Sequence, residues 1–244
     1  MYKATIIIPC YNAEKWIEKS ISSACEQSYE NIEVIFCDNE STDKSLDIAR
    51  QLKQTRYPQL IVETAPNIYK YSWEEPVNKS LSVSTGDYFT MLGADDYIDV
   101  DYVKNFMKFI SAAPDKIMLL QSAIRGVDKS ENYVGDLVHN YKSLSEFKNL
   151  LFQKCPVNTP TVVYNKKLYY DGLIDWQSDK WLGAVDYNLY FSLADKNLFI
   201  YPANMWLGYY YRWHEGQSTW GMQREERKFD IEIKNYWRKK WKLD

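Results

Sequence analysis

The sequence predicts an α/β protein built on a mostly parallel sheet with helices on both faces. The first observation is that 244 residues with 45% hydrophobic and 26% charged side chains are typical of one globular domain. The second is that short apolar runs alternate with segments of helical periodicity through the first part of the chain. Units of this kind are connected by crossovers, which make neighbouring strands parallel.

Four apolar runs in the first half are expected to form strands, with helices between them. The expected strands are Thr5–Pro9, Ile32–Cys37, Leu60–Glu63 and Asp87–Leu92. The first helix should bury Trp16, Ile17, Ile21, Ala24 and Cys25, the second should bury Leu46, Ile48, Ala49 and Leu52, and the third should span Val77–Ser84. Ser41 or Thr42 is expected to cap the second helix.

The second half is less regular, and strands and helices are expected in a mixed order. The expected strands are Ile117–Ala123, Thr161–Tyr164 and Leu207–Trp213, and the expected helices are Leu144–Phe152, Ala184–Ala194 and Gln223–Lys242. No repeat, low-complexity tract or linker interrupts the chain. We therefore expect one domain over residues 1–244, with a first half at 1–115, a second half at 116–222 and a C-terminal helix at 223–244.

Composition indicates which classes of partner the protein can be expected to bind and in which compartment it is expected to lie. A formal charge of −3 gives no reason to expect a nucleic-acid partner. The 21 Tyr and 9 Trp residues would suit carbohydrate binding, and they would equally suit a Tyr-rich core. The four cysteines lack a paired spacing, which indicates a reducing compartment. No apolar run approaches the roughly 20 residues that span a bilayer, so we expect a cytoplasmic protein, soluble or peripheral at the inner face of the membrane.

The basic C-terminal segment is the one feature that suggests membrane contact. Residues Arg238, Lys239, Lys240 and Lys242 surround Trp241, and such a segment could touch an anionic membrane. The alternative is a solvated final helix packed by its aromatic residues.

Polar residues follow three of the expected strands. They lie at Cys10–Asn12, Asp38–Asp43 and Gly93–Asp96. Ligand sites in parallel sheets gather beyond the carboxyl ends of the strands, so these three segments are expected to form one site.

These segments carry a family resemblance. TIIIPCYN at 5–12, VIFCDNESTD at 34–43 and TGDYFTMLGADD at 85–96 resemble, in order, glycosyltransferase family 2, the inverting enzymes of the GT-A fold. Ala184–Tyr187 and Tyr211–His214 form a weaker, later pair. The resemblance implies a Rossmann-like sheet in which residues 1–115 bind a nucleotide sugar and a smaller half at 116–222 binds the acceptor.

Asp38 is the candidate residue for recognition of the nucleobase. A carboxylate at a strand tip can accept a hydrogen bond from the ring N–H of uracil or guanine, and the resemblance assigns this role to the matching Asp. It also implies that Pro9, Tyr11 and Asn12 wall the base and ribose pocket, and a UDP-sugar is the favoured donor. Asn78 could contact the donor, or could cap or pack a helix. The alternative for Asp38 is a turn former before a helix.

Asp95 and Asp96 are the candidate metal ligands. Adjacent carboxylates raise each other's pKa unless a cation neutralises them, and a hard ion such as Mn²⁺ or Mg²⁺ does so through oxygen ligands. The pair resembles the family's DXD-type motif, although Gly93 stands where many relatives carry the first Asp. The alternative is two solvated loop acids. His214 could be a third metal ligand or a half-buried histidine in an aromatic cluster.

Asp186 is the candidate base. Direct displacement at an anomeric carbon needs a group that takes the acceptor's proton, and the resemblance implies an Asp at a helix start. Val185 precedes it where the family often has Glu, and the alternative is an acid favoured by the helix dipole. Asp179 and Asp175 are the next candidates, and Arg212 could face the diphosphate.

The expected function is therefore an inverting, metal-dependent glycosyltransferase. It would move a sugar from a nucleoside-diphosphate donor to the hydroxyl of a glycan or lipid-linked acceptor, in polysaccharide or glycoconjugate synthesis. Gly93 and Val185 favour an alternative, a catalytically degraded domain that binds nucleotide or glycan. A nucleotidyltransferase is disfavoured, because Cys10–Ala13 stands where such enzymes have a glycine-rich, basic phosphate loop.

Overall fold

A computed structural model describes residues 1–69, 72–113, 117–217 and 227–243. The strands are β1 (Ala4–Cys10), β2 (Ile32–Asp38), β3 (Ile61–Thr64), β4 (Tyr88–Met91), β5 (Tyr97–Ile98), β6 (Leu119–Asp128), β7 (Tyr133–Leu137), β8 (Val163–Asn165) and β9 (Tyr201–Trp213). The α-helices are α1 (Ile17–Cys25), α2 (Ser45–Thr55), α3 (Glu74–Val83), α4 (Tyr102–Ala112), α5 (Leu144–Leu151), α6 (Lys167–Tyr170), α7 (Ser178–Trp181), α8 (Val185–Asp195) and α10 (Arg227–Trp241). The short 3₁₀ turns η1 (Thr159–Thr161) and η2 (Leu182–Ala184) complete the described elements.

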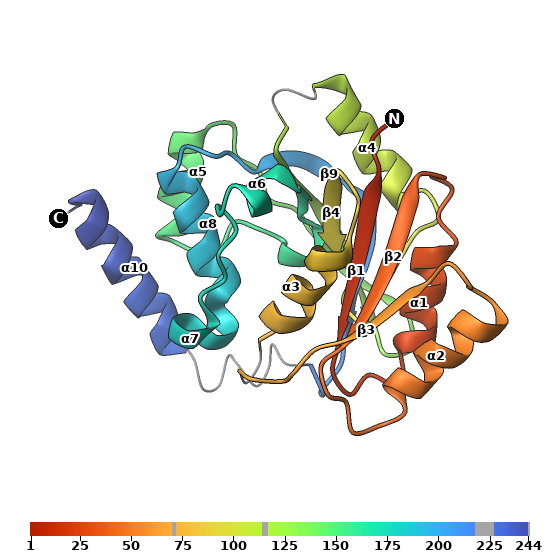
Figure 1. The fold of residues 1–244 in the computed structure, drawn as a ribbon. Helices are drawn as coiled ribbons and strands as arrows, with labels where there is room; N and C mark the ends of the chain where they lie inside the picture. The colour runs from red at the N-terminus through yellow and green to blue at the C-terminus, as the bar shows by residue number, and fades with distance from the viewer. Residues whose placement is uncertain (70–71, 114–116, 218–226, 244) are drawn as a thin grey trace.

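One mixed sheet runs through the molecule in the order β3-β2-β1-β4-β8-β6-β9-β5, with β7 paired to β6 (Figure 1). The first four strands are mutually parallel, as the crossover argument predicts. Among the remaining strands, β6 and β9 are parallel, whereas β8, β7 and β5 are antiparallel to their neighbours. The predicted α/β class is confirmed, and the antiparallel strands other than β5 lie in the half where the sequence shows no regular alternation.

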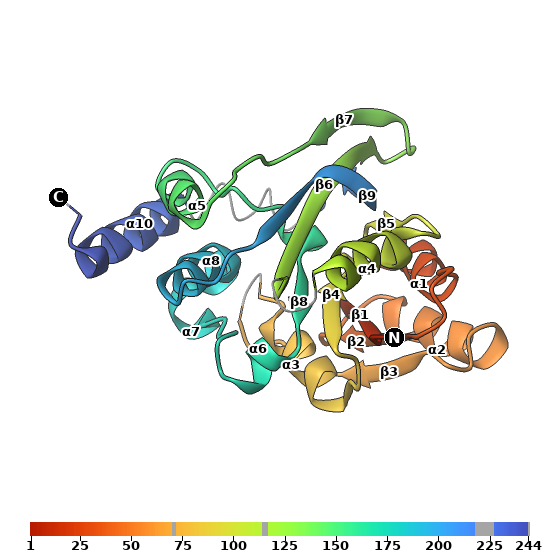
Figure 2. The same cartoon turned by 90° about the horizontal axis from the view of Figure 1, so that it is seen from above.

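The two faces of the sheet carry separate hydrophobic clusters. Alternate residues of β1 point to opposite faces, so Ile6 and Ile8 belong to one cluster and Ile7 to the other. Residues of α1, α2 and α4 pack into the first cluster, and residues of α3, α5, α8 and α10 pack into the second. Figure 2 shows these two groups of helices on either side of the strands. The predicted covering of both faces is therefore confirmed.

The carboxyl ends of β1, β2 and β4 point to the lower edge of the sheet in Figure 1. Because β8 is antiparallel to β4, its first residue lies at the same edge, and Val163 pairs with Thr90 there. The parallel strand β9 ends at this edge, and α8 begins there (Figure 1). This edge, the carboxyl edge, is where the three predicted polar segments meet.

Several local predictions differ from the structure. The cap of α2 is neither Ser41 nor Thr42: the helix begins at Ser45, whose backbone N–H donates to the Asp43 carboxylate at 2.9 Å. The third helix begins earlier than predicted, at Glu74. The final helix is described from Arg227, so residues 223–226 of that prediction lie outside the described residues. The strand predicted at Ile117–Ala123 extends further, as β6, to Asp128, and α4 and β7 are elements without a prediction.

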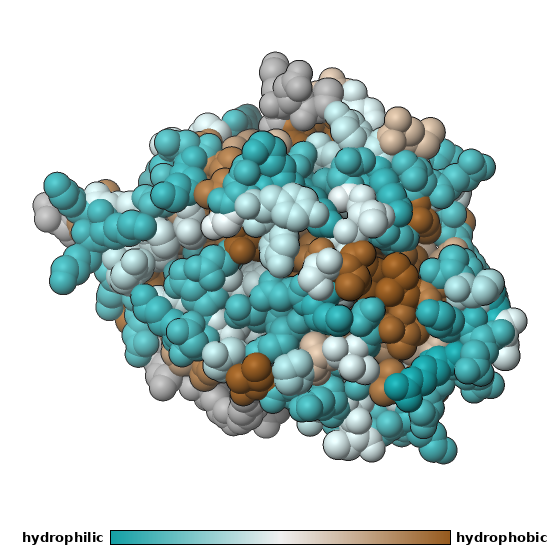
Figure 3. All heavy atoms as spheres, in the orientation of Figure 1, coloured by the Kyte–Doolittle hydropathy of each residue, from teal (hydrophilic) through white to brown (hydrophobic). Residues whose placement is uncertain are grey.

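All four cysteines are free thiols. Within the described ranges, the helices are too short or too polar for any of them to cross a membrane. The face shown in Figure 3 is mostly hydrophilic, with one hydrophobic patch over β2 and β3.

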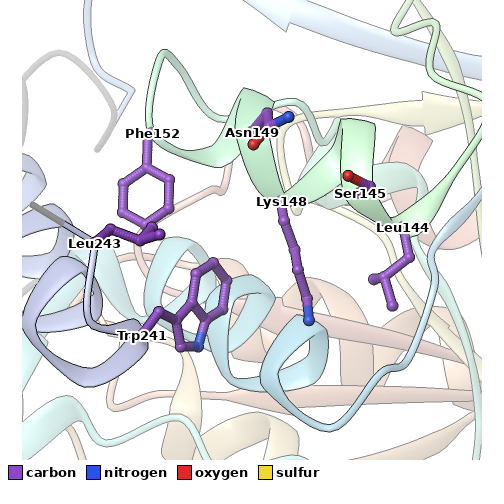
Figure 4. Close-up of a pocket in the computed structure, with 7 residues that line it drawn as sticks. All are labelled: Leu144, Ser145, Lys148, Asn149, Phe152, Trp241 and Leu243. Carbon is purple, nitrogen blue, oxygen red and sulfur yellow. The ribbon is translucent and has the colours of Figure 1, made fainter.

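A groove of about 380 Å³ lies between α5 and α10 (Figure 4). Leu144, Lys148, Phe152 and Trp241 are among its lining residues, and the Lys148 ammonium lies 5.2 Å from the centre of the Trp241 ring. None of the candidate site residues lines this groove.

Candidate active site

Asp38 ends β2 at the carboxyl edge, opposite Cys10 of β1. Its side chain is buried, and one carboxylate oxygen accepts the backbone N–H of Ser41 at 3.0 Å. The other oxygen, Oδ1, is buried and has no hydrogen-bond partner among the described residues. A buried oxygen without a donor is costly, so Oδ1 is the Asp38 oxygen whose capacity to accept a hydrogen bond is unused among the described residues. The turn-forming role and the ligand-binding role of Asp38 are thus compatible.

Asn12 joins the loop after β1 to the loop after β2. Its backbone is left-handed, with φ of 53°, and its side-chain oxygen accepts the backbone N–H of Thr42 at 2.8 Å. Its own N–H donates to the Ser41 hydroxyl at 2.9 Å. Tyr11 beside it is 54% exposed, and Pro9 is half-buried. These residues therefore border the space beside Asp38, with Asn12 fixing the shape of the border.

Asn39 and Asn78 differ in their connection to these residues. Asn39 was not singled out in the sequence, yet its side-chain amide donates to the carbonyl of Pro66 at 2.7 Å and so ties the loop after β3 to the end of β2. Asn78 is half-buried on α3, and no hydrogen bond among the described residues joins it to the other candidates. The structure therefore does not connect Asn78 to the rest of the site.

Asp95 and His214 meet although 119 residues separate them in the chain. The His214 Nε2 atom lies 2.9 Å from Asp95 Oδ2, and the two side chains are 15% and 29% exposed. The ring of Trp16 lies against the imidazole, with centroids 5.4 Å apart. A carboxylate and an imidazole that face each other at a half-exposed position are suitable ligands for Mn²⁺ or Mg²⁺.

Arg212 holds this pair in place rather than facing a ligand. Its guanidinium is 2% exposed, donates to the Asp95 carbonyl at 2.8 Å and to the Glu131 carboxylate at 3.3 Å. It also lies 4.4 Å from the centre of the Trp16 ring. Because these partners occupy the guanidinium, the expectation that Arg212 faces the diphosphate is not met in this structure.

Asp96 is turned into the protein. Its carboxylate accepts the Tyr209 hydroxyl and the backbone N–H of Arg212, each at 2.8 Å, and the residue is 2% exposed. Burial, with the nearby Asp95 carboxylate adding to it, raises the pKa of Asp96 well above its usual range. Asp96 thus connects the end of β9 to the loop after β4, and each of its carboxylate oxygens already accepts a hydrogen bond.

Gly93 accounts for this orientation of Asp96. A Cβ atom at Gly93 would lie only 2.6 Å from Asp96 Oδ2 and 3.0 Å from Asp95 Oδ1. An aspartate at position 93 therefore does not fit while Asp96 is turned inward. Within the described part of the chain, no three His, Cys, Asp or Glu residues gather as a metal-binding group. Among the described residues, Asp95 and His214 are the two side chains at this loop that could contact a metal ion.

Asp186 lies in the first turn of α8 at the same edge. The Thr159 hydroxyl donates to Oδ2 at 2.6 Å, and the backbone N–H of Tyr187 donates to Oδ1 at 2.7 Å. Burial is the main cause that raises the pKa of Asp186, and the nearby Asp230 carboxylate adds to the rise. Asp175 and Asp179 are exposed, so neither shares the surroundings of Asp186.

The three acidic groups follow the strand order along the carboxyl edge. Asp38 ends β2, Asp95 follows β4, and Asp186 is bonded to Thr159 just before β8. Neighbouring strands are about 4.8 Å apart, so the ends of β2 and β4, with β1 between them, are separated by roughly 10 Å.

Comparisons with known proteins give matches in sequence and in fold. The model of the family described as Glycosyl transferase family 2 matches residues 5–173, which is more than half of the chain. The Escherichia coli UDP-Glc:alpha-D-GlcNAc-diphosphoundecaprenol beta-1,3-glucosyltransferase WfaP is 26% identical over 227 residues, covering 90% of this chain and 80% of that protein.

Solved structures show the same fold. S. aureus TarS in complex with UDP-GlcNAc gives a TM-score of 0.70 at 22% identity and covers 88% of this chain and 60% of that chain. The mannosyltransferase PcManGT from Pyrobaculum calidifontis, in complex with GDP-Man and Mn²⁺, gives 0.64 at 19% identity over 91% of this chain and 61% of that chain. The chain spans only 15% of the length of another curated relative.

Proposed function

The chain belongs to glycosyl transferase family 2, and from that premise we propose that it moves a sugar from a UDP-sugar to an acceptor hydroxyl with inversion at the anomeric carbon. The observation that carries the proposal is the row of three carboxylates at one sheet edge, each in a different environment. Asp38 offers a buried, unpaired oxygen, Asp95 faces an imidazole, and Asp186 has a raised pKa.

Asp38 would hold the base of the donor. The ring N–H of uracil would donate to Oδ1, which would remove the cost of leaving that buried oxygen unpaired. Pro9, Tyr11 and Asn12 would border the base and ribose. Guanine offers a similar N–H, and the uracil donor is favoured by the complex of the TarS relative with UDP-GlcNAc.

Asp95 and His214 would hold Mn²⁺ or Mg²⁺. The residues fit such an ion, because one oxygen and one nitrogen ligand already face each other and diphosphate oxygens and water commonly complete the coordination. A bound ion supplies Lewis-acid stabilisation of the diphosphate as it leaves. The relative from Pyrobaculum calidifontis that binds GDP-Man together with Mn²⁺ supports this ligand class. Asp96 would act by keeping β9, and with it His214, against the Asp95 loop.

Asp186 would be the base. The acceptor oxygen attacks the anomeric carbon, its proton passes to the Asp186 carboxylate, and the bond from the anomeric carbon to the diphosphate oxygen breaks with its electron pair. A raised pKa makes a carboxylate a stronger base near neutral pH. The name of the E. coli relative specifies an acceptor linked to diphosphoundecaprenol, and we propose a glycan or lipid-linked sugar as the acceptor here. The exposed Lys239 of α10 and Lys242 just after it would favour contact with an anionic membrane that carries it.

The test is release of UDP from UDP-glucose and UDP-GlcNAc, and of GDP from GDP-mannose, with Mn²⁺ and a panel of acceptor glycans. We expect release from a UDP-sugar that falls at least a hundredfold in Asp186→Asn, because proton transfer contributes about 10²–10⁴ to such rates. Asp179→Asn, an exposed acid on α7, is the matched control and should retain activity.

A second candidate function is a nucleotide-binding module without turnover. The observation that favours it is the inward Asp96, which leaves two protein ligands at the metal position. Stabilisation by UDP in a thermal melt, with no release from any donor and no effect of Asp186→Asn, would select this candidate over the transferase.

A further inference from the structure

Thr159 is the partner of Asp186 that comes from another element. Its hydroxyl donates to Oδ2 at 2.6 Å, whereas the bond to Oδ1 comes from Tyr187, the next residue on α8. The bond from Tyr187 follows from the helix itself and would form wherever the helix lay. The contact to Thr159, on the turn η1, therefore fixes the position of the Asp186 side chain relative to the end of the sheet.

The turn that carries Thr159 is fixed by buried hydrogen bonds to β6. The backbone N–H of Asn158 donates to the Gln121 side chain at 2.9 Å, and the Asn158 amide donates to the carbonyls of Ser122 and Leu137 at 2.9 and 3.0 Å. The Thr161 hydroxyl donates to the Ser122 carbonyl at 3.1 Å. Buried polar groups tolerate few arrangements, because each lost bond is expensive, so η1 is held in one conformation.

The other groups facing Asp186 do not supply a donor to it. Asp230 of α10 raises the pKa of Asp186, and the half-buried Cys155 thiol lies near enough for Asp186 to raise the pKa of that thiol in turn. The hydroxyls of Tyr164 and Tyr190 are buried without a hydrogen-bond partner among the described residues, and burial raises the pKa of both. Of these surroundings, burial and the Asp230 carboxylate disfavour an ionised Asp186.

We propose that Thr159 is a positioning residue for Asp186, and that its hydroxyl, fixed by the Gln121–Asn158 network, holds the base carboxylate in one orientation toward the acceptor. The inference rests on the proposed function, in which Asp186 takes the acceptor's proton. A hydroxyl that donates to a carboxylate favours the ionised form, so Thr159 opposes the effect of burial and of Asp230. Without it, more of Asp186 would be protonated near neutral pH and unable to act as a base.

The test is a carboxyl-carbon NMR titration of the ¹³C-aspartate-labelled chain without ligand, with Asp186 assigned from Asp186→Asn. Thr159→Val keeps the shape of the side chain and removes the donor. We expect the titration midpoint of Asp186 to rise by about one pH unit, because a hydrogen bond to a charged group contributes about that much. Thr159→Ser should restore the midpoint.

Thr90→Val is the matched control, because the Thr90 hydroxyl is buried at the neighbouring strand end and donates to the Val162 carbonyl at 3.1 Å. We expect it to lower stability and to leave the Asp186 midpoint unchanged. An unchanged midpoint in Thr159→Val, or an equal rise in Thr90→Val, would overturn the inference.

UDP release separates this inference from the function on which it rests. In Thr159→Val the acid limb of the kcat profile should move to higher pH by the same amount, with the KM for the UDP-sugar unchanged. Full activity in Asp186→Asn would show that Asp186 is not the base. The NMR titration would still test whether the Thr159 hydroxyl stabilises the ionised Asp186 carboxylate. If Asp186→Asn is inactive and Thr159→Val does not shift the Asp186 midpoint, the inference about Thr159 fails and the proposed function is kept.

Discussion

Glu33 joins the amino ends of the three strands whose other ends carry the site. Its carboxylate accepts the Lys3 ammonium at 2.8 Å, the Thr5 hydroxyl at 2.7 Å and the Thr85 hydroxyl at 2.7 Å. The backbone N–H groups of Thr85 and Gly86 donate to it at 2.6 and 2.9 Å. Thus β2 is tied to β1 and to the turn before β4 by one side chain, and Glu33→Gln should loosen all three.

The pKa of Glu33 gives the size of the expected effect. Burial alone would raise this pKa, but the hydrogen bonds from Lys3, Thr5 and Thr85 outweigh it and lower the pKa from 4.5 to about 2. The side chain is only 9% exposed, so solvent screens the effect little. The shift corresponds to about 3 kcal/mol of folding free energy at pH 7. Because the folded pKa is the lower one, this stability is present above pH 4.5 and is lost as the pH falls toward 2.

Urea unfolding followed by tryptophan fluorescence measures the loss. Glu33→Gln should lower the free energy of unfolding by about 3 kcal/mol at pH 7 and by only about 1 kcal/mol at pH 3, with the slope m unchanged. Lys3→Met, which removes one donor and leaves the carboxylate, should cost less than Glu33→Gln at pH 7. A Glu33→Gln variant within 0.5 kcal/mol of the wild type at pH 7 would refute the reasoning, and so would a loss that does not shrink toward acid pH.

Two further predictions concern the Asp96 loop and the thiols. Tyr209→Phe removes the hydroxyl that bonds the Gly93 N–H and one Asp96 oxygen, and the free energy of unfolding in urea should fall by roughly 2–4 kcal/mol. A fall of less than 0.5 kcal/mol would contradict the structural role given to the buried Asp96 carboxylate. Burial raises the pKa of Cys10, Cys25 and Cys37 to about 12, so a thiol-reactive dye at pH 8 should label them at least a hundredfold more slowly than in urea. Equal labelling rates in the folded and unfolded chain would be the contrary result.

The first half of the fold is predictable because its signals are local. The strands β1, β2 and β4 are short, mostly apolar runs, and each is followed by polar residues at the carboxyl edge. The helix α4 was also predictable in principle, since Tyr102, Phe106 and Ile110 recur at helical spacing and are buried. The strand β7 gives no such signal, because nearly all of its residues are exposed and it pairs only with β6.

The internal arrangement of the site depends on contacts between distant residues. The carboxylates of Asp38, Asp95 and Asp186 could be named from their positions after strands or at a helix start. That Asp96 turns inward depends on Tyr209 and Arg212, more than a hundred residues away, and on the missing Cβ of Gly93. The contact between Thr159 and Asp186 likewise joins a turn and a helix that carry no common pattern.

The central claim is that Asp38 and Asp95 serve one nucleotide-diphosphate site, the first through the base and the second through a metal ion. Isothermal titration with UDP, in the presence and absence of Mn²⁺, tests it most directly in the wild type, Asp38→Ala and Asp95→Asn. We predict that Asp38→Ala weakens UDP binding at least tenfold in both conditions, because the base loses its acceptor. Asp95→Asn should abolish only the gain in affinity that Mn²⁺ provides. Wild-type UDP affinity in Asp38→Ala, or an undiminished Mn²⁺ effect in Asp95→Asn, would contradict the account.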